Sequence, residues 1–173
     1  MSAGCFALTW WPVGWLSRPP NPNAMALPST SVVLDTNIVL DLFIFKDVET
    51  QTLSDALSQS KLAWLATAGM REELERVMGY PKIAKRMAFY GIPAEEILEK
   101  FDTGTRNVEV PAKASATCKD GDDQKFIDLA VAHSAILLSK DQAVLCMAKR
   151  LNALGVIYTG PAGAIKTALP HLL

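Results

Sequence analysis

The sequence predicts an α/β fold: a three-layer α/β/α sandwich around a central, mostly parallel five-stranded sheet. Short apolar runs alternate along the chain with longer segments whose apolar residues recur at helical spacing. This alternation is typical of parallel strands joined by helices that cover both faces of a sheet. Two of the apolar runs lead directly into an aspartate, Asp35 and Asp141. Acidic side chains are therefore expected at the carboxyl edge of the sheet.

Five short apolar segments are predicted to be strands, at residues 31–34, 62–66, 107–110, 135–139 and 156–158. Strands buried on both faces have such continuous apolar runs. Seven amphipathic segments are predicted to be helices, at residues 38–45, 52–59, 68–78, 82–89, 94–101, 123–133 and 142–153. Thr67 is suited to cap the third helix, Pro93 suits the first turn of the fifth, and Gly155 marks the end of the last.

Composition limits the function classes. The chain has 173 residues, half of them hydrophobic, and a formal net charge of −1. This length suits one domain with a sizeable core. Near-neutral charge argues against a generally basic nucleic-acid surface, although a local basic patch is compatible with it. The cysteines, Cys5, Cys118 and Cys146, lack disulfide or metal-site spacing, so we expect reduced thiols in a cytoplasmic protein.

The first 29 residues differ from the rest, and we interpret them as a flexible N-terminal tail or an upstream extension. The domain itself is expected at residues 30–173. The apolar stretch at residues 5–16 is interrupted by Pro12 and Gly14 and is too short to span a membrane. Because no basic residues precede it, it does not have the form of a signal peptide. We therefore expect no membrane association.

Four acidic residues map to the carboxyl edge of the predicted sheet. Asp35 and Asp141 follow strands, Glu73 lies on the helix after the second strand, and Asp123 opens the helix that leads into the strand before Asp141. Open α/β sheets bind ligands in the crevice outside this edge. Carboxylates brought together repel one another unless a proton or cation lies between them, and Mg²⁺ or Mn²⁺ prefers oxygen ligands. Taken singly, each has an ordinary explanation as a helix cap or part of a solvated helix face.

Four segments resemble the PIN-domain ribonucleases, in the branch of toxins from toxin–antitoxin pairs. They occur in the family's order, at residues 33–37 (VLDTN), 73–82 (ELERVMGYPK), 119–126 (KDGDDQKF) and 137–141 (LLSKD). The resemblance implies a PIN-like fold and a metal-dependent endoribonuclease acting on single-stranded RNA. It also implies that the metal-binding and catalytic positions are Asp35, Glu73, Asp123 and Asp141. Asn37 and Ser139 match the family's supporting polar positions. We further expect a cognate antitoxin as partner, and a homodimer.

Departures from the family pattern and the basic residues add detail. The family often has threonine where this chain has Ser139, and serine keeps the hydroxyl. Lys140 beside it is interpreted as binding a phosphate or pointing to solvent.

The predicted phosphate-binding rim for RNA consists of Lys82, Lys85 and Arg86; a solvated charged face would explain the same cluster. The alternative RNA path passes three other lysines, Lys119, Lys125 and Lys140.

Two rival functions remain open at this stage. A phosphatase with an aspartyl nucleophile would also use an acidic crevice, but it requires a second aspartate two positions after the nucleophile, where this chain has Asn37. The other rival is a catalytically inactive PIN domain that binds RNA or a protein partner. The complete acidic set argues against it.

Overall fold

A sheet of five parallel strands lies at the centre of the fold, in the order β3-β2-β1-β4-β5. The strands are β1 (Thr30–Leu34), β2 (Leu62–Ala66), β3 (Thr105–Asn107), β4 (Ile136–Leu138) and β5 (Tyr158–Gly160). The computed structural model describes residues 30–165 and Pro170, so the predicted tail with Cys5 lies outside the described residues. The predicted α/β class and five-stranded sheet are confirmed.

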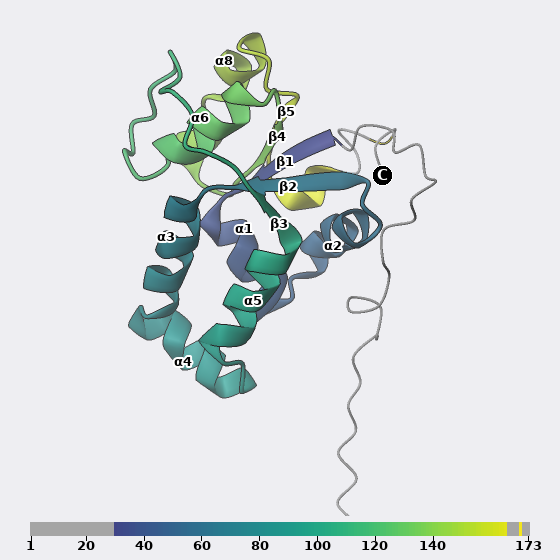
Figure 1. Ribbon diagram of the computed structural model, residues 1–173, viewed down its shortest axis with the longest axis vertical. Helices are drawn as coiled ribbons and strands as arrows, with labels where there is room; N and C mark the ends of the chain where they lie inside the picture. The colour runs from purple at the N-terminus through teal and green to yellow at the C-terminus, as the bar shows by residue number, and fades with distance from the viewer. Residues whose placement is uncertain (1–29, 166–169, 171–173) are drawn as a thin grey trace, which may run out of the picture.

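Helices cover both faces of this sheet, and Figure 1 shows α6 and α8 on one side and α1, α2 and α5 on the other. The helix α6 spans Gln124–Ala132 and α8 spans Ala148–Ala153, and the short α7 (Gln142–Leu145) precedes α8 in the chain. The other helices precede β3 in the chain: α1 (Thr36–Leu40), its π-helical continuation η1 (Asp41–Phe45), the 3₁₀ turn η2 (Val48–Thr50), α2 (Gln51–Ser58), α3 (Ala68–Met78), α4 (Pro81–Tyr90) and α5 (Ala94–Gly104). A short 3₁₀ turn, η3 (Ala162–Ala164), follows β5.

The strand order reverses at β1. From β1, the chain first extends the sheet through β2 and β3, and it then returns to place β4 and β5 on the opposite side. Val32, Val33 and Leu34 of β1 are paired in register with Ile136, Leu137 and Leu138 of β4. In open α/β sheets, the crevice beyond the strand ends at such a reversal is the usual ligand site. Here the corresponding region, named the crevice, is the space just beyond Leu34 and Leu138 at the ends of β1 and β4.

The continuous apolar runs of the strands are explained by burial on both faces. Every residue of β2 and of β4 is buried, as are Val32–Leu34 of β1. Trp64 of β2 packs between Phe43 and Phe101, with ring centroids 6.1 and 5.1 Å away. This packing attaches η1 and α5 to the sheet through β2.

Three predicted boundaries are wrong. The predicted strand 107–110 begins two residues later than β3, and 156–158 begins two residues earlier than β5. Both are edge strands in which polar or half-exposed residues form the ladder, so the apolar pattern is displaced from it. The predicted helix 142–153 is divided into α7 and α8 by a turn at Cys146 and Met147.

The predicted helix ends agree better with the structure. Thr67 is at the N-cap position of α3, although its side chain makes no capping hydrogen bond within the described residues. Pro93 directly precedes α5 instead of lying in its first turn. Gly155 adopts the left-handed φ of 94° just after α8, a conformation that glycine tolerates best.

Candidate metal centre

Asp35 is the most buried carboxylate of the crevice, with 4% of its surface exposed. Its backbone N–H continues the β1–β4 ladder by donating to the Leu138 carbonyl at 2.9 Å. Its side-chain Oδ2 accepts hydrogen bonds from Asn37 Nδ2 at 2.7 Å and from Ser139 Oγ at 2.5 Å. Burial raises the pKa of Asp35, and these two hydrogen bonds partly offset the rise. The carboxylate is thus held in one orientation at the strand end.

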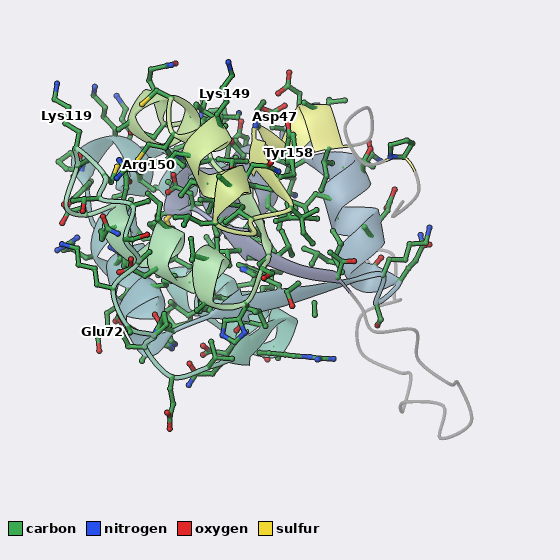
Figure 2. All side chains as sticks on the ribbon, turned by 90° about the horizontal axis from the view of Figure 1, so that it is seen from above. Asp47, Glu72, Lys119, Lys149, Arg150 and Tyr158 are labelled. Carbon is green, nitrogen blue, oxygen red and sulfur yellow. The ribbon has the colours of Figure 1, made fainter. Side chains whose placement is uncertain are left out.

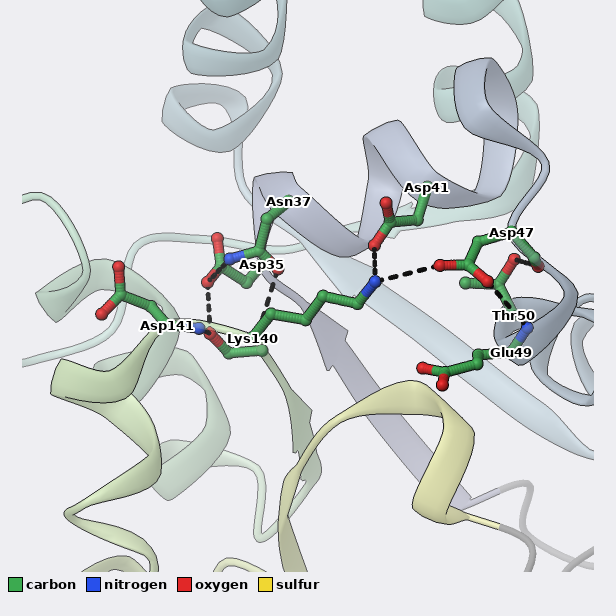
Figure 3. Close-up of polar contacts among 9 residues, drawn as sticks. Asp35, Asn37, Asp41, Asp47, Glu49, Thr50, Lys140 and Asp141 are labelled. Carbon is green, nitrogen blue, oxygen red and sulfur yellow. Dashed lines mark hydrogen bonds and ion pairs between the residues drawn. The ribbon is translucent and has the colours of Figure 1, made fainter.

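Ser139 links Asp35 to Asp141. Besides donating to Asp35, Ser139 Oγ accepts a hydrogen bond from the backbone N–H of Asp141 at 2.9 Å. The exposed Asp141 side chain caps α7, because its Oδ1 accepts from the Ala143 N–H at 2.7 Å. Asp141 therefore makes the contact of an ordinary helix cap. It also lies beside Asp35 (Figure 3).

Glu73 reaches the same crevice from α3. Its side chain is 13% exposed, and its Oε1 accepts a hydrogen bond from Thr36 Oγ1, the residue after Asp35, at 2.9 Å. Its other oxygen, Oε2, forms an ion pair with the ammonium of Lys125 on α6. Glu73 thus lies on the same edge of the sheet as Asp35.

Asp123 has the most unusual environment. It directly precedes α6, and its Oδ2 is buried without a hydrogen-bond partner among the residues that the structure describes. Burial, followed by repulsion from Asp35 and Asp141 and more weakly from Asp120 and Glu73, raises the pKa of Asp123 to about 6. The other three predicted carboxylates therefore all act electrostatically on Asp123.

The donor set fits a hard divalent cation, because carboxylate oxygens are the ligands that Mg²⁺ and Mn²⁺ prefer and one buried oxygen is unsatisfied. In the present arrangement, no three acidic, histidine or cysteine side chains within residues 30–165 converge tightly enough to hold an ion. The contacts explain why: Glu73 faces Lys125, Asp141 faces the Ala143 N–H, and Asp35 faces Asn37 and Ser139. The chemistry of the residues matches a metal centre, while their side chains are engaged with protein groups.

The sequence suggests a phosphate or solvent as the surroundings of Lys140, and in the structure its partly exposed side chain lies against two acidic residues. Its ammonium forms ion pairs with Asp41 Oδ2 at 2.7 Å and Asp47 Oδ2 at 3.1 Å, and its backbone N–H donates to Asn37 Oδ1 (Figure 3). The hydrogen bond to Asp41 is the main cause of its raised pKa. Lys140 thereby ties the loop after β4 to η1 and the loop that follows it.

The predicted basic rim lies on α4, where Lys82, Lys85 and Arg86 are all exposed. The Arg86 guanidinium is 5.7 Å from the Phe45 ring centroid and 5.6 Å from that of Tyr90, which fixes it by cation–π contacts. Figure 1 shows α4 beyond the end of α3 that points away from the sheet. The three basic residues therefore do not contact the carboxylates.

Sequence reasoning missed two residues that contact the carboxylates, Thr36 and Lys125. From the sequence, Lys125 is expected only on the alternative RNA path. A hydroxyl next to Asp35 and a lysine two positions after Asp123 were available signals, but their directions depend on tertiary packing.

Two further expectations concern thiols and membranes. The two cysteines in the described part of the chain, Cys118 and Cys146, are free thiols, and burial raises the pKa of Cys118. None of the helices described for this chain has the length and apolar character needed to cross a membrane.

Comparison with known proteins gives one match. A family model described as PIN domain matches residues 31–143, which is more than half of the chain and includes all four carboxylates. No curated protein and no solved structure gives a significant match.

Proposed function

Because the chain belongs to the PIN-domain family, whose members are generally nucleases, we propose that it is a Mg²⁺- or Mn²⁺-dependent endoribonuclease that hydrolyses phosphodiester bonds of single-stranded RNA. The observation that carries the proposal is Asp123, a half-buried carboxylate that has an unsatisfied oxygen in the described residues and is repelled by four further acidic groups. Such repulsion is costly unless a cation offsets it.

The acidic residues would hold the metal, and their neighbours would position them. Asp35, Glu73, Asp123 and Asp141 are the proposed ligands. When bound, the ion would lower the pKa of a water and neutralise charge on the phosphate. Asn37 and Ser139 hold the Asp35 carboxylate through one oxygen, which leaves its other oxygen for the crevice.

Substrate binding would be shared between the crevice and α4. The crevice is acidic and repels phosphates in the absence of a cation, so the positive charges that attract RNA must lie elsewhere. Lys82, Lys85 and Arg86 on α4 are exposed and are proposed to contact RNA phosphates. Contacts of this kind carry little sequence information.

The biological role that we propose is that of the toxin in a cytoplasmic toxin–antitoxin pair, acting as a homodimer and inhibited by a cognate antitoxin protein. The support is the resemblance of four ordered segments to that branch of the family. Expression of the chain should arrest growth, and co-expression of a small DNA-binding protein encoded by a neighbouring gene should relieve the arrest. Growth at the normal rate during expression of the active enzyme would contradict the toxin role.

The nuclease proposal is tested with the purified full chain on three substrates of the same sequence: single-stranded RNA, duplex RNA and single-stranded DNA. We expect internal cleavage of single-stranded RNA with Mg²⁺ or Mn²⁺ and none with a chelator. Asp123→Asn should lose cleavage, whereas Asp55→Asn, the same change at an exposed position on α2, should retain it. Cleavage in the presence of chelator, or by Asp123→Asn at the wild-type rate, would refute the proposal.

A further inference from the structure

The carboxylates of the crevice differ in the groups that contact them. Asp35 accepts hydrogen bonds from the neutral groups of Asn37 and Ser139, and Asp141 accepts one from a backbone N–H. Glu73, by contrast, forms an ion pair with Lys125. A protein cation therefore already lies against one of the oxygens proposed to bind the metal.

Several contacts hold the Lys125 side chain in the crevice. It lies in the first turn of α6, two residues after Asp123, and its side chain is 29% exposed. Its ammonium also donates to the Asp122 carbonyl at 2.7 Å and lies 5.1 Å from the ring centroid of the buried Phe126. These contacts direct the ammonium toward Glu73.

Glu73 is equally constrained, because Thr36 Oγ1 holds its Oε1 at 2.9 Å. Its Oε2 is buried and faces Lys125. Glu73 comes from α3 and Lys125 from α6, which lie on opposite sides of the sheet in Figure 1, so their ion pair joins the two sides beyond the strand ends. A divalent cation could use the Oε2 of Glu73 only if the ammonium left it, since two positive charges at one oxygen repel each other.

We propose that Lys125 is the internal counter-ion of the metal centre, which occupies the Glu73 carboxylate in the metal-free protein and is displaced when a divalent cation binds. The inference rests on the proposed function, in that it assigns Glu73 to the metal. After displacement, the Asp122 carbonyl still holds the ammonium at the crevice, because that hydrogen bond does not depend on Glu73. Lys125 thus sets how tightly the metal binds without being one of its ligands.

The test measures Mn²⁺ affinity of the full chain in the absence of RNA, by calorimetry on protein first stripped with a chelator. Lys125→Met removes the competing charge and should bind Mn²⁺ about tenfold more tightly than the wild type. Lys125→Arg keeps the charge and should bind with wild-type affinity. Lys119→Met is the matched control, because it changes net charge equally at an exposed residue that points outward (Figure 2). It should leave affinity unchanged.

A second variant separates competition from a general effect on folding. In a Glu73→Gln background, where the shared oxygen has lost its charge, Lys125→Met should no longer tighten Mn²⁺ binding. Equal or weaker Mn²⁺ binding by folded Lys125→Met would overturn the proposal, as would an undiminished effect in the Glu73→Gln background.

The two proposals fail in different ways. Tighter Mn²⁺ binding by Lys125→Met in a protein that cuts no RNA would support the counter-ion and refute the nuclease. An active nuclease whose Mn²⁺ affinity does not change in Lys125→Met would refute the counter-ion alone.

Discussion

Each carboxylate of the crevice meets a different local environment, and single substitutions can separate their roles. Asp35 is buried and hydrogen-bonded, Glu73 is paired with a lysine, Asp141 caps a helix, and Asp123 has a raised pKa. Removing the charge of Asp35 or Asp123, which neighbouring carboxylates repel, should therefore affect stability and activity in opposite directions, because the same repulsion that destabilises the empty crevice would attract a metal ion.

Asp35→Asn should abolish cleavage and raise the melting temperature of the chelator-treated protein. Cleavage should fall by at least about 100-fold, since residues that only orient a metal ligand already contribute about 10–100-fold. The amide removes repulsion with Glu73 and keeps an oxygen that Ser139 Oγ can reach; a gain of about 1 kcal/mol would raise the melting temperature by about 2–4 °C. Cleavage and thermal melting would be measured on the same preparation. Undiminished cleavage would remove Asp35 from the catalytic set.

The raised pKa of Asp123 predicts how stability depends on pH without metal. Between about pH 4 and 6 the unfolded chain has lost the Asp123 proton while the folded protein still holds it. The free energy of unfolding should therefore fall as pH rises through this interval and level off above about pH 6. Melting curves with chelator from pH 4 to 8 would measure the fall, and Asp123→Asn should show a smaller one. An identical profile for the two proteins would contradict the assigned pKa shift.

Which site residues could be predicted follows from side-chain length and backbone position. Asp35 directly follows β1 and Asp141 lies three residues after the end of β4, so strand direction alone brings them to one edge. Lys125 and Lys140 have long side chains whose partners come from distant elements, α3 in one case and η1 in the other. No local pattern specifies which partner such a side chain meets.

At the scale of elements, α4 is a largely exposed helix: Met87 is the one buried residue among its ten, while Phe89 is 77% exposed. Tyr80, which precedes the helix, and Tyr90, its last residue, are about half exposed. An exposed helix that combines aromatic rings with basic side chains suits single-stranded RNA, whose bases stack on aromatic rings while lysines contact phosphates.

Replacing Lys82 and Lys85 together by alanine should weaken binding to unrelated single-stranded RNAs. The slope of log affinity against log salt should fall by about 1.4, at about 0.7 for each phosphate that the variant no longer neutralises. Arg86 is left in place because its contact with the Phe45 ring also attaches α4 to η1. Fluorescence anisotropy at several salt concentrations gives both quantities.

The control for this experiment is a double alanine substitution at Lys149 and Arg150 on α8, at the opposite end of the molecule from α4 (Figures 1 and 2). It removes the same charge and should leave the salt slope unchanged. If both double variants behave alike, α4 is a solvated face and RNA follows another path.

Element boundaries show where sequence patterns lose information. The limits of α3 follow from the sequence because its apolar residues recur regularly and Gly79 follows its last turn. Edge strands are different. Arg106 and Asn107 of β3 are exposed and polar, so an apolar pattern cannot mark the residues that hydrogen-bond with β2. Whether a segment forms a strand depends on its hydrogen bonds with a second segment, and the residue pattern of one segment alone does not show them.

At the scale of the whole molecule, the sheet begins at Thr30, and all five strands lie between that residue and Gly160. We expect that deleting residues 1–24 leaves the melting temperature and the RNA cleavage rate unchanged, because the deleted segment precedes the first strand. Thermal melting and the cleavage assay would be run side by side with the full chain. Loss of soluble protein would show that the tryptophans of this segment contribute to packing.

The pairing of β1 with β4 gives the crevice an order of assembly during protein synthesis. The hydrogen bond between Asp35 and Ser139 joins residues 104 positions apart. At about 5–20 residues per second, the ribosome needs about 5–20 s to make the chain between them. A nascent chain therefore carries Asp35 and Glu73 well before Asp123, Ser139 and Asp141 exist. The proposed ribonuclease therefore cannot cleave the messenger RNA from which it is being translated until most of its chain has been made.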